Sequence, residues 1–208
     1  METYQELAKS VVISAKKNRL LRYVDALTLV GTGRSAFVFR IKSSSKAIKI
    51  FFPEFTYIAK EEADIYKALQ DISYFPTIYD AGPNYIVMDY IEGRTLFECV
   101  NQGFPITSEH IDEIDRALSM ALKRGLNPSD IHLRNIFITA TNEIKLIDVA
   151  RFRQTKDCTQ WSDLKAVYSH YYTKRYFPKK IPAPVMNTVA FFYKKQLIPH
   201  QLSSSKMD

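Results

Sequence analysis

Several features that would assign this chain to a familiar class are missing from it. The sequence has no run of 18 or more apolar residues, which excludes a typical membrane-spanning helix. Its two cysteines, Cys99 and Cys158, lack the spacing of a metal or redox motif and fit a reducing cytoplasm. The segment Met1–Leu7 is polar and acidic, without the basic flank and apolar core of an export signal. These absences predict a soluble cytoplasmic protein.

The length and the hydrophobic content of the chain are sufficient for one packed core. The chain has 208 residues, of which 46% are hydrophobic, so we expect a single domain. Its net charge is +7, and part of that excess lies near the C terminus. The basic residues there are Lys174, Arg175, Lys179, Lys180, Lys194 and Lys195, and the aromatic residues between them are Tyr171, Tyr172, Tyr176, Phe177 and Tyr193. Such a surface is compatible with an acidic or RNA-associated partner, although it is more often a solvated face over an aromatic core.

A glycine-containing turn interrupts two apolar runs between Leu27 and Phe39. Gly31 and Gly33 stand at the break, and Ala36 lies where the second run resumes. Because glycine has no Cβ, backbone amides at such a turn can approach phosphate oxygens closely. Taken alone, a Gly-x-Gly turn is more often an ordinary hairpin. The interpretation therefore depends on the rest of the chain.

The two segments that follow predict a charged pair. Residues Lys46–Phe52 alternate as a strand, which places Lys49 among apolar neighbours in its middle. In the helix expected over Tyr57–Leu69, Glu62 lies in the middle of the apolar stripe. A buried carboxylate is costly unless it is paired, so Lys49 and Glu62 are natural partners. For either residue alone, a position at the rim of the surface would be the commoner outcome.

A second group of polar residues follows in the C-terminal half. Asp130 stands five residues before Asn135, and Asp148 follows two short apolar strands. If these strands pair Phe137 with Leu146, Asn135 falls opposite Asp148. An amide oxygen and a carboxylate that face each other suit a hard divalent cation. Asp130 would then lie close to the group that this cation binds. The spacing therefore predicts a site for a metal and a phosphate.

The order of these features resembles that of the protein kinases. A glycine turn, a strand lysine and a helix glutamate precede an Asp-x-x-x-x-Asn loop and a further aspartate. From about Leu27 to about Tyr172, the chain is similar to small bacterial serine/threonine kinase-like proteins of the YrzF type, and its C-terminal part is trimmed like that of RIO-type kinases. The resemblance implies an α+β, two-lobed protein-kinase-like fold in a single domain, 1–208. An antiparallel-sheet N-lobe with an N-terminal helix would occupy residues 1–90, and a minimal helical C-lobe would occupy residues 91–208.

The resemblance also implies roles for individual residues. The residues implied for ATP binding are Gly31, Gly33, Ala36, Val38, Ala47, Lys49, Met88, Asp89 and Ile91. The residues implied for catalysis are Lys49 and Glu62 as an ion pair, Asp130 as the base, and His132 near the transferred phosphate. The residues implied as ligands of Mg or Mn are Asn135 and Asp148.

Some positions depart from the protein-kinase pattern. Pro128-Ser129 replaces the usual His-Arg before the catalytic aspartate, and Val149-Ala150 replaces Phe-Gly after the metal-binding one. His132 stands where most serine/threonine kinases have lysine, which is similar to aminoglycoside and choline kinases. The segment between Asp148 and Asp163 is short, and no Ala-Pro-Glu follows it, so it has little room for a peptide-docking platform.

These observations favour an ATP-dependent phosphotransferase. In the first place we expect a serine/threonine protein kinase that transfers the γ-phosphate of ATP to a hydroxyl. A small-molecule kinase is the second enzymatic alternative, favoured by His132 and by the short segment. An ATP-binding pseudokinase scaffold is the third, favoured by Pro128 and by Val149-Ala150. The acceptor itself does not follow from the sequence.

The remaining periodic segments are expected to be helical. Helices are predicted over residues 2–18, 94–100 and 107–124, and a last one contains Val185, Val189, Phe192 and Leu197. Ser108 is the expected cap of the third helix and Gly125 its end. Asp163 either braces the catalytic loop, as a resemblance to the central C-lobe helix of kinases implies, or is stabilised by the dipole of its own helix.

Overall fold

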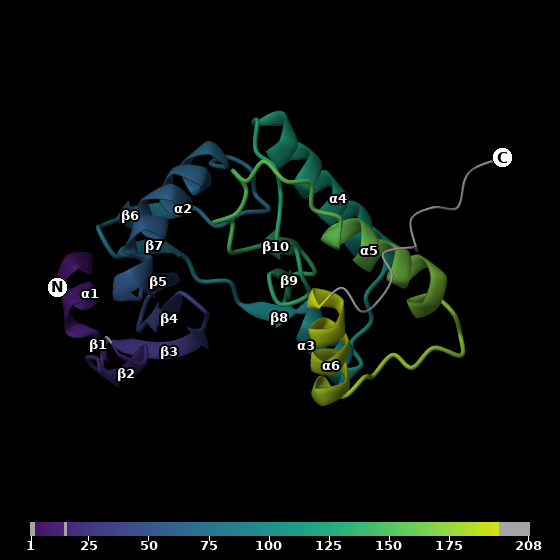
Figure 1. The fold of residues 1–208 in the computed structure, drawn as a ribbon, viewed down its shortest axis with the longest axis horizontal. Helices are drawn as coiled ribbons and strands as arrows, with labels where there is room; N and C mark the ends of the chain where they lie inside the picture. The colour runs from purple at the N-terminus through teal and green to yellow at the C-terminus, as the bar shows by residue number, and fades with distance from the viewer. Residues whose placement is uncertain (1–2, 15, 196–208) are drawn as a thin grey trace. The chain divides into compact units, whose positions relative to one another are not determined.

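The computed structural model describes residues 3–14 and 16–195, which form two compact units. The first unit contains the described residues up to Ile91 and also Ile147–Arg153. The second unit contains Glu92–Leu146 and the described chain from Gln154 onward. Figure 1 shows the elements in chain order, from purple to yellow. The class is α+β, as the sequence predicts.

A five-stranded antiparallel sheet dominates the first unit. Its strand order is β3-β4-β5-β7-β6. The strands are β3 (Leu27–Thr32), β4 (Ala36–Ile41), β5 (Lys46–Phe51), β6 (Ile78–Ala81) and β7 (Tyr85–Asp89). A separate ribbon of β1 (Val12–Ser14) and β2 (Arg19–Arg22) precedes them. Isoleucine, valine and phenylalanine fill the central strands, and such side chains pack well on a pleated surface.

Helices pack on the sheet of the first unit (Figure 1). They are α1 (Tyr4–Ser10), the short 3₁₀ helix η1 (Pro53–Phe55) and α2 (Thr56–Ala68). Helix α1 packs Leu7 into a buried cluster with Ile48 and Ile50 of β5. Helix α2 contacts β5, β6 and β7. Because side chains alternate along a strand, Lys49 of β5 points to the face opposite Ile48 and Ile50.

The N-terminal helix is shorter than the sequence predicts. The expected helix over residues 2–18 was wrong in extent, because α1 ends at Ser10 and strand β1 begins at Val12. A capping box starts the helix, in which Thr3 N donates to Glu6 Oε2 at 2.7 Å and Glu6 N donates to Thr3 Oγ1 at 3.2 Å. The β-branched run Val11–Ile13 then favours extended backbone. Ala15, which falls within the range predicted as helical, lies outside the described residues.

The second unit combines helices with a small antiparallel sheet of order β10-β9-β8. Its elements are β8 (Gly93–Thr95), α3 (Leu96–Gln102), α4 (Ser108–Lys123), β9 (Ile136–Thr139), β10 (Ile144–Leu146), α5 (Gln160–Val167), the π-helical turn η2 (Tyr168–Tyr172) and α6 (Ala183–Lys194). The helix expected over 94–100 is therefore β8 followed by α3. Thr107, not Ser108, caps α4, and the predicted Leu197 lies outside the described residues. Within residues 3–14 and 16–195, no helix is long and apolar enough to cross a membrane.

The ribbon of β9 and β10 pairs one residue away from the predicted register. Phe137 lies opposite Lys145 and not opposite Leu146. A shift of one residue turns each side chain to the other face of a ribbon, so register decides which residues oppose each other. The predicted ladder position of Asn135 opposite Asp148 is therefore wrong.

Candidate active site

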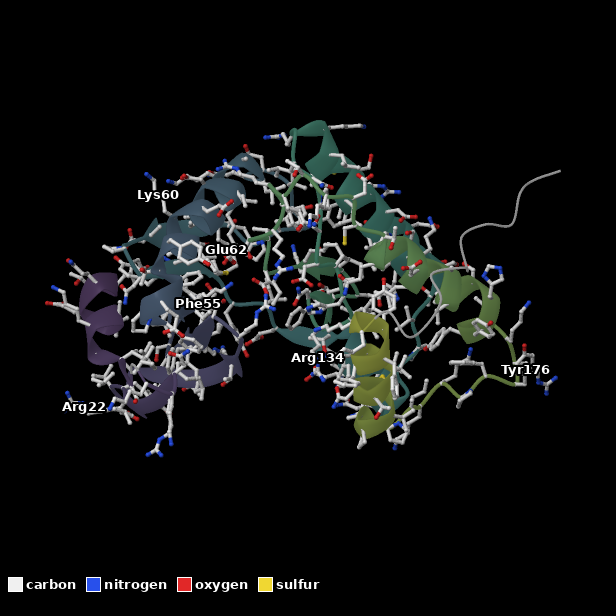
Figure 2. The ribbon with its side chains drawn as sticks, in the orientation of Figure 1. Arg22, Phe55, Lys60, Glu62, Arg134 and Tyr176 are labelled. Carbon is white, nitrogen blue, oxygen red and sulfur yellow. The ribbon has the colours of Figure 1, made fainter. Side chains whose placement is uncertain are left out.

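A buried ion pair joins the middle of β5 to the middle of α2. Lys49 Nζ lies 2.8 Å from Oε1 and 2.7 Å from Oε2 of Glu62. Glu62 is fully buried, and Lys49 is 8% exposed. Strand alternation turns Lys49 toward α2, and the helical repeat places Glu62, which is marked in Figure 2, on the packed face of that helix. The ion pair predicted from the sequence is formed.

Lys49 also contacts Asp148, the third charged residue of the first unit's site. Its Nζ lies 2.9 Å from Asp148 Oδ1, so one ammonium group bridges two carboxylates. Burial by itself would lower the pKa of Lys49, but attraction to Glu62 and Asp148 outweighs it and holds that pKa above its ordinary value. Lys49 therefore stays charged. The side chain of Asp148 is 47% exposed, so its ion pair with Lys49 does not bury it.

Three of the residues predicted to surround a nucleotide share one face of the sheet with Lys49. In the antiparallel register, Val38 of β4 pairs with Lys49, and Ala47 pairs with Met88 of β7. Directly paired residues point to the same side of a sheet, and residues two apart on a strand do so too. Val38, Ala47 and Met88 therefore lie on the Lys49 face. Gly31, which pairs with Val38, extends this face to the glycine turn.

The glycine turn is tight, but its own geometry does not require glycine. Gly33 N donates to Ala36 O at 2.9 Å, which closes the turn between β3 and β4. Neither Gly31 nor Gly33 has a positive φ, and a Cβ added at Gly31 would make only ordinary contact, at 3.5 Å, with Val38 Cβ. The absence of both Cβ atoms thus leaves room outside the chain for a ligand.

Part of the predicted hinge is committed to the first unit's own backbone. The N–H of Asp89 donates to Thr77 O at 3.1 Å, and the N–H of Tyr90 donates to Ser45 O at 2.8 Å. The carboxylate of Asp89 accepts from Thr77 N at 2.8 Å and from Tyr79 Oη at 2.7 Å. The carbonyl of Asp89 and the N–H of Ile91 lie outside these bonds. An adenine edge would therefore have to use hinge groups other than the N–H groups of Asp89 and Tyr90.

The second unit assembles Asp130, His132 and Asn135 in one loop. Asn135 Nδ2 donates to the backbone O of Asp130 at 3.2 Å, and Asn135 N donates to His132 O at 2.9 Å. Asn135 is 7% exposed. Ser129 is fully buried and its Oγ donates to Asn127 O at 2.9 Å, which fixes the start of the loop.

Asp130 and Asp148 both have backbone in the left-handed region. Their φ angles are 62° and 61°, values that residues other than glycine seldom adopt, although aspartate tolerates them better than most. Such conformations persist where the surroundings hold them, and they concentrate at functional sites. Among the described residues other than glycine, the two aspartates predicted to do the chemistry share a positive φ with Asn18, Ser43, Asp71 and Asn142.

Two further side chains hold the segments around the loop. Arg134 lies beside α6 (Figure 2), where it donates to Asn187 Oδ1 at 2.9 Å and stacks 3.5 Å from the ring centroid of Phe97. Asn127 Nδ2 donates to Gln154 O at 2.9 Å and to Lys156 O at 3.1 Å. The short segment after Asp148 is therefore tied to the start of the predicted catalytic loop.

Two residues that contact the predicted site, Tyr66 and Asn127, were not predicted from the sequence. Tyr66 lies one helical turn after Glu62 on the same buried face, and its Oη accepts from Asp148 N at 3.1 Å. The apolar stripe of α2 was a signal that could have found it. Asn127 left no such signal, since its partners are backbone carbonyls whose position depends on the path of the chain.

Two other polar side chains, those of Asp163 and His110, are buried in the second unit. Asp163 is 8% exposed in the first turn of α5, where it accepts from Thr159 Oγ1 at 3.1 Å and from Tyr193 Oη at 2.7 Å. His110 is buried in α4, and its Nε2 lies 2.9 Å from Asn142 Oδ1.

Comparison with other proteins complements the geometry. The chain is 43% identical over 211 aligned residues to YrzF of Bacillus subtilis, whose name assigns it to the serine/threonine-protein kinases; the match covers 99% of this chain and 98% of that protein. A Clostridium acetobutylicum protein named as a probable serine/threonine-protein kinase is 25% identical over 86% of this chain, which spans only 29% of that longer protein. PknB of Mycobacterium tuberculosis, named a serine/threonine-protein kinase, is 35% identical over 37% of this chain and 13% of its own length. No family model matches the chain.

Proposed function

This chain belongs to the YrzF family of serine/threonine-protein-kinase-like proteins, and from that premise we propose that it transfers the γ-phosphate of ATP to a serine or threonine hydroxyl of a protein. The observation that carries the proposal is the position of Lys49. It is held between Glu62 and Asp148 on the sheet face that also carries Val38, Ala47 and Met88. This arrangement suits a nucleotide, because its base could pack on the apolar side chains while its phosphates bind the ammonium group of the lysine.

The predicted metal ligands fit a hard divalent cation in their chemistry. Asp148 offers a half-exposed carboxylate and Asn135 a side-chain amide oxygen, and Mg accepts one or two such protein ligands together with phosphate oxygens and water. Within the part of the chain that the structure describes, no cluster of three or more His, Cys, Asp or Glu could hold a metal by itself. When bound, Mg or Mn would neutralise charge on the phosphates.

In the proposed reaction, this chain's residues bind, orient and move a proton. Lys49 would hold the α and β phosphates, and Glu62 would keep the lysine in place. Asp130 would accept the proton of the acceptor hydroxyl as the phosphoryl group is transferred. His132 would lie near the transferred phosphate and help to place the acceptor. Backbone groups of Asp89 and Ile91 would bind the adenine edge.

A small-molecule hydroxyl is the second candidate acceptor. His132 occupies the place of the usual lysine, and Asn127 ties the segment after Asp148 closely to the loop. Such a short, fixed segment offers little surface for an extended peptide. This observation favours a small acceptor over a peptide without changing the chemistry at Asp130.

An acidic partner is proposed for the basic part of the second unit. From Lys165 to Lys195 the chain has seven Lys or Arg and no Asp or Glu. Tyr176, marked in Figure 2, is 79% exposed and Tyr171 is 42% exposed among these charges. Exposed aromatic and basic residues together suit an acidic protein surface or RNA. Binding that weakens steeply with salt would support this part of the proposal.

One experiment tests the function and separates the acceptors. Phosphate transfer from γ-labelled ATP should be measured to the chain itself, to generic proteins and to a panel of hydroxyl-bearing metabolites, each with and without Mg or Mn. We expect metal-dependent transfer to protein serine or threonine. Transfer only to a metabolite would select the small-molecule alternative, and metal-dependent ATP binding without any transfer would select a nucleotide-binding scaffold.

A further inference from the structure

The hydroxyl of Tyr66 forms a second connection between α2 and Asp148. Tyr66 Oη accepts a hydrogen bond of 3.1 Å from the backbone N–H of Asp148, and Tyr66 is 1% exposed. Lys49, itself paired with Glu62, holds the carboxylate of the same aspartate at 2.9 Å. Helix α2 therefore contacts the backbone of Asp148 directly through Tyr66 and its carboxylate indirectly through Glu62 and Lys49.

The backbone of Asp148 needs such a support. Its φ of 61° is unfavourable for a residue with a Cβ, so neighbouring groups must hold it there. The residue that follows is Val149, which is fully buried but has a short side chain. Because Tyr66 is buried, water cannot readily replace its hydroxyl, and without that hydroxyl the N–H of Asp148 would lose its acceptor.

The chemical state of Tyr66 fits the role of an acceptor. Burial raises the pKa of its hydroxyl well above the ordinary value, and the nearby carboxylates of Glu62 and Asp148 raise it further. Tyr66 is therefore a neutral phenol throughout the physiological pH range. Its ring also packs in the interior of the first unit, so a purely structural role is the alternative that a test has to exclude.

We propose that Tyr66 is a positioning residue for Asp148, whose hydroxyl fixes the metal-binding segment to α2 and so presents the Asp148 carboxylate to a metal–ATP complex in one orientation. This inference rests on the proposed function, in which Asp148 is a metal ligand. It follows that a displacement of α2 would release the amide and the carboxylate of Asp148 together.

The first test needs no ligand. Tyr66→Phe removes one oxygen and keeps the ring, so hydrogen exchange at the Asp148 amide should become at least about fivefold faster. Tyr85→Phe is a matched control, because Tyr85 is 5% exposed in the same unit and its Oη donates to Asp80 Oδ2 at 2.9 Å. This control should lower the melting temperature by a similar amount and leave exchange at Asp148 unchanged.

The second test follows ATP binding while the Mg concentration is varied. In Tyr66→Phe, the Mg concentration for half-maximal ATP binding should rise roughly threefold to tenfold, the equivalent of one ordinary hydrogen bond. In Tyr85→Phe it should not change. A merely structural role of Tyr66 predicts lower thermal stability and an unaltered Mg dependence.

The outcomes separate this inference from the proposed function. Faster exchange at Asp148 together with a weaker response to Mg supports the positioning role. Unchanged exchange at Asp148, or an unchanged Mg dependence despite faster exchange, overturns it. If the wild-type chain binds no ATP with Mg, the proposed function fails and the positioning role fails with it, whereas the exchange result still reports whether the hydrogen bond exists.

Discussion

The two units hold their predicted catalytic residues by different means. In the first unit, Lys49 and Glu62 are buried charges that depend on each other and on Asp148. In the second, Asn135 donates from its side chain to the backbone of Asp130, and the bond does not involve the Asp130 carboxylate. A buried charge that loses its partner is strongly destabilising, whereas a bond to a backbone oxygen can persist when the side chain of the same residue is changed.

This difference teaches where function and stability can be separated. In the first unit, the residues that would bind phosphate also hold the fold together, so most substitutions there should affect both properties. In the second unit, the two bonds that Asn135 donates within the loop are accepted by the backbone oxygens of Asp130 and His132. A substitution in the second unit should therefore be able to abolish catalysis at little cost in stability. The following predictions test this contrast between the units.

The largest effect is expected at Asp130. Asparagine tolerates a left-handed backbone as aspartate does, so Asp130→Asn suits the φ at this position. The variant also keeps the backbone carbonyl that Asn135 contacts. Turnover should fall about a hundredfold to ten-thousandfold because the proton acceptor is lost, while the melting temperature and Mg-ATP affinity stay nearly unchanged. Steady-state kinetics and calorimetry would measure both.

The control for this prediction is His132→Ala, which should reduce turnover less than Asp130→Asn. Equal turnover in the wild-type chain and in Asp130→Asn would contradict the assignment of the base. A large drop in melting temperature in Asp130→Asn would instead contradict the contrast between the units.

The second effect is expected in the buried pair of the first unit. Lys49→Met should lower the free energy of unfolding by about 3–5 kcal/mol, because it leaves Glu62 buried without a partner. Adding Glu62→Leu should recover much of that loss, and ATP affinity should show the same lack of additivity. Urea denaturation and calorimetry of both single variants and the double variant form the cycle. Additive losses would mean that the two residues do not act as a unit.

The smallest effect is expected at alkaline pH. Burial, together with the hydrogen bond to Asp80, raises the pKa of Tyr85 from an ordinary value of 10.0 to about 12. Because the folded state favours the neutral phenol, its contribution is complete below pH 10 and is lost as the pH rises through about 12. The stability advantage of the wild-type chain over Tyr85→Phe should therefore shrink across this range. A constant difference in urea midpoints would contradict the assigned shift.

Much of the first unit could be predicted from local pattern. Alternation in residues 46–52 and the apolar stripe of the following helix are strong periodic signals, and together they locate Lys49 and Glu62 correctly. The contact between Asn135 and Asp130 also follows from their short, local spacing, while the catalytic role of the loop stays a prediction. In these cases the interacting residues are fixed by one strand, one helix or one loop.

Other features depend on geometry that periodicity does not encode. The register of β9 and β10 is set by the turn after Thr139, where Asn142 has a φ of 65°, and the alternation of apolar residues fits more than one register. The end of α1 depends on β-branched residues that also fit a helical stripe. The bond from Asp148 to Tyr66 depends on a left-handed backbone at Asp148, which sequence alone gave no reason to expect.

Calorimetric titration of the chain with ATP, with and without Mg, tests the central claim most directly. If Asp148 joins the protein to a metal and its phosphates, the wild-type chain should bind ATP with Mg, and binding should fall sharply when Mg is removed or when Asp148 is replaced in Asp148→Ala. ATP binding that is equally strong without Mg and in Asp148→Ala, or no ATP binding at all, would contradict the account.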